Sequence, residues 1–137
     1  MIAKFYIPCP PYGQARARRS ASGGMFTPQK NKDYALRVKA AFYEAGISVD
    51  KKQFVSPLQV SIEAVFDPPK ISATKLTQLR YVCKRPDADN IAKMVLDSLN
   101  GMAFHDDAQV HTLCVAKRWA HNANKSQGVY VEISYLI

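Results

Sequence analysis

The regular alternation of apolar and polar residues between Leu58 and Phe66 constrains the fold of this chain more than any other segment. Apolar side chains occupy every second position, which is the repeat of a β-strand and not of a helix. The sequence Asp67-Pro68-Pro69 then ends the strand, because proline cannot donate to the hydrogen-bond ladder of a sheet. The rest of the chain must therefore supply its neighbours in a sheet.

Three further segments have the composition of strands, and two have the periodicity of helices. The strand segments are rich in β-branched and aromatic side chains, and the helical segments carry apolar residues three and four positions apart. Thr27-Pro28 is a typical helix start, and Gly46 is a typical stop. The predicted strands are residues 2–8, 108–119 and 129–137, and the predicted helices are residues 28–45 and 88–100.

The order β-α-β-α-β-β predicts an α+β fold, in which two helices pack on one face of a small β-sheet. The chain of 137 residues is 47% hydrophobic, which suits one domain over residues 1–137 with a single core. The polar link at 122–128 favours a hairpin between the last two strands. Residues 129–137 are apolar on both faces, which favours a strand covered on both sides. Residues 12–27 and 70–85 are predicted loops, the second of them basic with a short helix.

Composition excludes several classes of protein. No apolar run approaches the roughly 20 residues of a membrane span, and no basic-then-apolar leader opens the chain. The three cysteines are widely spaced, odd in number and without a Cys-x-x-Cys pair, so neither a zinc ribbon nor a disulfide framework is expected. We therefore expect a reduced, cytoplasmic protein with no membrane partner.

The charge of the chain points to a polyanionic partner. Nineteen Lys and Arg residues against eleven Asp and Glu residues give a net charge of +8. A small basic domain of this kind usually binds nucleic acid, and the alternative is a basic surface that serves solubility. Five of the eleven acidic residues nevertheless lie in one window, namely Asp87, Asp89, Asp97, Asp106 and Asp107.

These clustered carboxylates suit metal-dependent phosphodiester hydrolysis. Asp87 and Asp89 point the same way if the chain is extended between them, and Lys93 lies one helical turn beyond Asp89. Three converging carboxylates would bind Mg²⁺, and a nearby lysine would stabilise the charge of the phosphate. Asp107 reaches the other two only if tertiary packing folds it back. The alternatives are a capped helix start, an Asp89–Lys93 ion pair and a simple turn at Asp106.

The carboxylates belong to a long composite motif. KRPDADNIAK starts at Lys84, LDSLNG follows at Leu96, and DDAQV begins at Asp106. This motif resembles the RusA family of Holliday-junction resolvases, whose pattern is RPDxDNxxKxxxDxLNG followed by DDxQV. The resemblance extends to the N-terminus, where a strand ends in Pro-Pro and leads through an Arg-rich loop to a helix. The Asn-Arg that is common after this Pro-Pro has no clear match in Tyr12-Gly13-Gln14-Ala15.

The resemblance implies a role for each matching residue. It makes Asp87, Asp89 and Asp107 the magnesium-binding catalytic residues, with Lys93 as an essential lysine, and it makes Asp106 and Asn90 supporting residues. It also implies Mg²⁺ as the cofactor, which Mn²⁺ can replace, and a homodimer that resolves four-way DNA junctions by paired symmetric nicks in recombination and repair. Family members are bacterial and often carried by phages and prophages. The alternatives are a catalytically inactive DNA-binding protein and a less selective nuclease of the same fold that acts on flaps or forks.

Other residues are candidates for contact with DNA. The predicted phosphate contacts are Arg16, Arg18 and Arg19 in the first loop and Lys84 and Arg85 beside the acids.

The remaining expectations concern aromatic residues and the dimer. Tyr12, Phe26 and Tyr81 could stack on unpaired bases, although packing is favoured for all three. Trp119 is expected in the core and His105 at the surface. A junction with two-fold symmetry suits a two-fold dimer, and the first strand and the doubly apolar last strand are the candidates for its surface.

Overall fold

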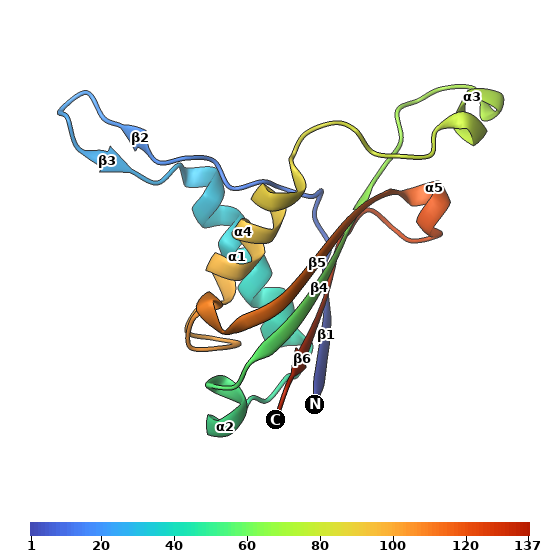
Figure 1. The fold of residues 1–137 in the computed structure, drawn as a ribbon. Helices are drawn as coiled ribbons and strands as arrows, with labels where there is room; N and C mark the ends of the chain where they lie inside the picture. Colours follow the sequence, from blue (N-terminus) through green and yellow to red (C-terminus); the bar gives the residue numbers. More distant parts are fainter.

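A mixed four-stranded sheet forms the centre of the computed structural model, which describes residues 1–137 (Figure 1). In spatial order its strands are β1 (Ile2–Ile7), β6 (Gly128–Tyr135), β4 (Leu58–Phe66) and β5 (Val110–Trp119). Strand β6 runs antiparallel to both of its neighbours, whereas β4 and β5 are parallel. Within the loop predicted at 12–27, β2 (Arg18–Arg19) and β3 (Met25–Phe26) form a small separate hairpin.

Two long helices cover one face of the sheet, as the sequence predicts. Helix α1 packs against α4 and β1, and α4 also packs against β5 (Figure 1). None of the helices combines the length and the apolar composition that a membrane span requires. The helices are α1 (Gln29–Glu44), α2 (Lys51–Phe54), α3 (Ala73–Gln78), α4 (Ala88–Leu99) and α5 (Ala120–Ala123), with a 3₁₀ turn, η1 (Asp107–Gln109), before β5.

The core lies between this helical layer and the sheet. Val60 on β4 is fully buried, and so are Ile91, Val95 and Leu99 at helical spacing on α4. Burial of each such side chain contributes roughly 1.5–3 kcal/mol to the stability of the fold. The amphipathic patterns of the sequence therefore correspond to the two layers that meet in the core.

The order of the strands differs from the sequence prediction. The last two strands do not form a hairpin, because β6 lies between β1 and β4 and is not a neighbour of β5. Helix α4 provides the crossover that sets β5 parallel to one side of β4, which leaves the other side for β6. The free edges of the sheet thus belong to β1 and β5.

The predicted covering of both faces of the last strand is also wrong. Burial alternates along β6, with Val129, Val131 and Ile133 buried and Tyr130 and Glu132 only half-buried. Because β6 is an interior strand, it has no free edge with which to pair with a second copy. Of the two strands predicted to form a dimer surface, only β1 keeps a free edge, and the predicted surface itself stays a prediction.

Candidate functional site

The start of α4 presents two exposed aspartates. Asp87 occupies the N-cap position with extended backbone angles, and Asp89 lies in the first helical turn. Because the helix begins at Ala88, the chain is not extended between the two carboxylates, and the strand geometry assumed for them is wrong. Helical geometry places Lys93, which is also exposed, one turn beyond Asp89.

Neither a capping hydrogen bond nor an ion pair engages these two carboxylates, although Asp89 in the first turn suits the dipole of α4. Asp87 accepts no capping hydrogen bond from the backbone of α4. Asp89 and Lys93 form no ion pair, since the ion pairs of the chain all use Glu63 or Glu132. Helix capping and ion pairing are therefore excluded as explanations, and both side chains are free to bind a ligand.

Asp107 is held in place by its neighbours. The side-chain oxygen of Gln109 accepts from the backbone N–H of Asp106 at 2.8 Å, and the Asp106 carboxylate accepts from the backbone of η1 at 3.2 Å. The amide nitrogen of Gln109 also donates to the carbonyl oxygens of Phe54 at 3.0 Å and Ser56 at 2.8 Å. Asp106 and Gln109 thus close the turn that carries Asp107, and Gln109 fastens this turn to the end of α2 and the residues that follow it. The contacts that distinguish Asp106 from Asp107 are local, because Asp106 and Gln109 form a capping box, and the Asp-x-x-Gln spacing was the signal for it in the sequence.

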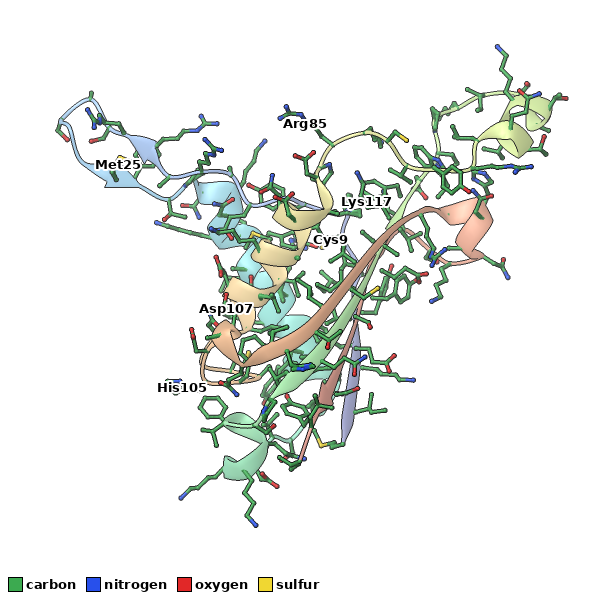
Figure 2. All side chains as sticks on the ribbon, in the orientation of Figure 1. Cys9, Met25, Arg85, His105, Asp107 and Lys117 are labelled. Carbon is green, nitrogen blue, oxygen red and sulfur yellow. The ribbon has the colours of Figure 1, made fainter.

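The surroundings of Asp107 are acidic. Partial burial raises the pKa of the Asp107 carboxyl, and the nearby carboxylates of Asp106 and Asp97 raise it further. Asp97 lies eight residues beyond Asp89 on α4, which corresponds to about 12 Å along the helix axis. Figure 2 shows Asp107 near one end of α4 and Arg85 near the other.

The three predicted metal ligands therefore do not converge within one chain. No group of three or more His, Cys, Asp or Glu side chains lies close enough to hold a metal ion. Asp87 and Asp89 lie at the start of α4, whereas Asp107 lies beside Asp97 towards its end. A single chain consequently does not fit a three-carboxylate magnesium site.

Cations surround the start of α4. The Lys84 ammonium lies over the rings of Phe66 and Trp119, at 5.6 and 5.5 Å from their centroids. Lys117 donates from its ammonium to the carbonyl oxygen of Lys84 at 2.5 Å, which ties the end of β5 to the segment before α4. Arg85 is exposed next to Lys84.

The β2–β3 hairpin adds a second basic element at the same end of the molecule. Arg16, Arg18 and Arg19 are exposed in and before this hairpin, which projects from the fold near the start of α4 (Figure 1). The five predicted DNA contacts therefore lie on two segments that flank Asp87 and Asp89.

The segment after the first Pro-Pro packs closely against α4. The backbone N–H of Gln14 donates to the carbonyl oxygen of Asn90 at 3.1 Å. A Cβ on Gly13 would lie 2.8 Å from Cβ of Pro86 and 3.1 Å from Cβ of Asn90, so only glycine permits this approach. The carbonyl oxygen of Asn90 thus joins α4 to the segment after the first Pro-Pro, and the supporting role of Asn90 in the site stays a prediction. The sequence offered one signal of this contact, the glycine after Tyr12.

The aromatic candidates divide into packed and exposed residues. Tyr12 is half-buried and donates to Asn31 Oδ1 at 2.6 Å, and Trp119 is buried as predicted. Tyr81 and Phe26 are 79% and 46% exposed, so the packing predicted for these two residues is wrong. His105 is exposed as expected, with its ring edge against Phe54.

A basic α+β chain whose exposed aspartates have no structural partner has the features of an enzyme that acts on nucleic acid. The sequence model of the family described as endodeoxyribonuclease RusA matches residues 8–134 of the chain. The chain therefore belongs to the RusA family of endodeoxyribonucleases, which confirms the resemblance found in its motifs. A comparison with curated proteins finds no match.

Proposed function

We propose that this chain is a magnesium-dependent endodeoxyribonuclease that resolves four-way DNA junctions by paired symmetric nicks. The observation that carries the proposal is the pair of exposed aspartates, Asp87 and Asp89, which have no structural partner and lie between two basic segments in a RusA-family chain. A protein that only binds DNA gains nothing from unpaired carboxylates that repel phosphate. Lys93 supports the proposal, because its free ammonium can stabilise charge on the phosphate that is cut.

Cleavage of a synthetic junction with and without Mg²⁺ tests this function. Asp87→Asn and Asp107→Asn should abolish cutting, while binding of the junction persists because the basic surface is unchanged. Full activity of either variant contradicts the assignment. Binding by the wild-type chain without any cutting in Mg²⁺ supports the inactive binding protein. Equal cutting of flaps, forks and junctions supports the less selective nuclease.

We further propose that the active form is a homodimer whose metal sites are shared between two copies. Three carboxylates meet in no single chain, and the strand β5 offers a free edge of 10 residues. The C-terminal end of β5 lies beside the start of α4, through the bond from Lys117 to Lys84. If two β5 strands pair antiparallel about a two-fold axis, the N-terminal end of each strand approaches the C-terminal end of the other. The partner's Asp107 then approaches Asp87 and Asp89, and these three residues would together hold Mg²⁺.

Mixed dimers test this arrangement directly. A dimer of one Asp87→Asn chain and one Asp107→Asn chain contains one intact site only if the site is shared between chains. Co-refolding of the two inactive variants should therefore restore nicking of one strand per junction. Mixing Asp87→Asn with Asp89→Asn is the matched control and should stay inactive, because both changes affect the same half of the site.

Two results would contradict the shared site. One is failure of the Asp87→Asn and Asp107→Asn mixture while the wild-type chain cuts junctions. The other is a 15.3 kDa monomer that cuts at full rate. Light scattering during the cleavage assay provides the second measurement, and it does not depend on activity.

A further inference from the structure

Tyr81 is the most exposed aromatic residue of the chain, and nothing in the fold uses its ring. Its side chain is 79% exposed, although it lies only six residues before Asp87. An aromatic ring normally stabilises a fold by burial, and this one adds nothing in that way. Exposure alone does not set Tyr81 apart, because Tyr43 is 78% exposed as well, so any role of Tyr81 depends on what surrounds it.

The backbone around Tyr81 is fixed on both sides. His121 Nε2 lies 3.1 Å from the carbonyl oxygen of Leu79, and Asn122 donates to the carbonyl oxygens of Leu79 and Arg80 at 3.0 and 3.1 Å. On the other side, Lys117 binds the carbonyl oxygen of Lys84. These contacts fasten the segment to α5 and β5, so that the exposed ring is presented from an anchored backbone.

Charge around the ring is strongly positive. Between the proline pair at 68–69 and Pro86 the chain carries five cations and no acidic residue. The cations are Lys70, Lys75, Arg80, Lys84 and Arg85, and all five are exposed. Figure 1 shows this segment, with α3, projecting from the same end of the fold as the β2–β3 hairpin.

We propose that Tyr81 is a stacking site for an unpaired nucleobase of branched DNA. An exposed ring on an anchored backbone can stack on a base at little entropic cost, and flanking cations can hold the adjoining phosphates. Stacking accepts any base, so the site selects strands that are open and not a particular sequence. Tyr81 is thus a positioning residue that sets the substrate beside Asp87 and Asp89. This inference rests on the proposed function, because stacking on Tyr81 would give the proposed nuclease site its preference for unpaired nucleotides.

Binding of three DNA probes tests the proposal without any cleavage. The probes are a four-way junction with 2-aminopurine at the branch point, a single strand and a continuous duplex, all in EDTA. Tyr81→Ala should weaken binding of the junction and the single strand by about tenfold, within the range of one lost stacking contact. Binding of the duplex should change less than about twofold. Tyr81→Phe keeps the ring and should bind all three probes like the wild type.

Tyr43 provides a matched control, because it is 78% exposed on α1 and is not part of the site. Tyr43→Ala should leave all three affinities and the rate of cleavage unchanged. Wild-type affinity of Tyr81→Ala for the junction would overturn the proposal, and so would an equal loss on junction and duplex. The 2-aminopurine signal on binding should also differ between Tyr81→Ala and Tyr81→Phe. If the wild type fails to cut junctions but the loss of single-strand binding in Tyr81→Ala persists, the proposed function fails and the stacking site stands.

Discussion

At the scale of single residues, ionisation of the Asp107 carboxyl destabilises the folded chain. Its pKa is raised in the folded chain, mainly by partial burial and then by Asp106 and Asp97. The folded state therefore binds the Asp107 proton more tightly than the unfolded state does. Below the ordinary Asp pKa of about 3.9 the group is neutral in both states and has no effect. As the pH rises through the raised pKa, ionisation lowers the free energy of unfolding.

Asp107→Asn should consequently raise the thermal stability of the chain in EDTA near neutral pH. The gain should shrink as the pH is lowered towards about 4, because the wild-type carboxyl then becomes protonated. Thermal unfolding of both chains across this pH range measures the difference. An equal gain at every pH would show that the charge of Asp107 is not its cause.

Lys93 offers a second test at this scale, because its ammonium is exposed and forms no ion pair. Lys93→Ala should lower the rate of junction cleavage by roughly 10²–10³-fold, as loss of one transition-state contact typically does. Its free energy of unfolding should stay within about 0.5 kcal/mol of the wild-type value. Single-turnover cleavage, junction binding and urea unfolding give the three quantities. Lys52→Ala on α2 is the control. Undiminished nicking by Lys93→Ala would contradict the proposed role of Lys93 in stabilising charge on the phosphate.

At the scale of elements, the spacing of apolar residues predicted individual strands and helices, because each of these elements depends mainly on residues that are close in the sequence. The alternation at Leu58–Phe66 gave a strand with those same bounds, and the helix expected at 88–100 is α4. Strand order was not predictable, because the place of β6 between β1 and β4 depends on contacts far apart in the sequence. The same limit applied to the site. The motif predicted Asp87 and Asp107 as site residues, whereas their placement near opposite ends of α4 follows only from the tertiary fold.

Gly128 is an element-scale test, because it begins β6 where that strand meets β1. A Cβ at this position would lie 2.6 Å from the carbonyl oxygen of Ile7 and would also meet the ring of Tyr6, and its φ of +151° disfavours other residues. Gly128→Ala should lower the free energy of unfolding by roughly 2–4 kcal/mol, measured by denaturant unfolding.

The control for this change is Gly46→Ala. Gly46 also has a positive φ, of +68°, but a Cβ added to it would meet no atom within 4 Å, so only backbone strain of about 1 kcal/mol is expected. Equal losses in the two variants would show that close packing of β6 on β1 is not what requires Gly128.

At the scale of the whole molecule, the net charge of +8 understates the positive surface offered to DNA. The hairpin and the segment around α3 project from one end of the fold, and the short helix α2 lies at the other end (Figure 1). Five of the eleven acidic residues that lower the net charge lie along α4, in η1 or immediately before them. The effect of a cation on DNA binding should therefore depend on where it lies and not on the net charge alone.

Salt dependence of binding tests this distribution. Replacing Arg18 and Arg19 with alanine, or Lys51 and Lys52 with alanine, removes two positive charges in each case. Only the arginine pair lies on the hairpin, so only its loss should reduce the number of counterions released on binding. The slope of log K against log[salt] should become shallower by about 2 in Arg18→Ala/Arg19→Ala and stay unchanged in Lys51→Ala/Lys52→Ala. Fluorescence anisotropy with a labelled junction measures both slopes. Equal changes in the two variants would mean that the chain attracts DNA through its net charge, without a defined basic face.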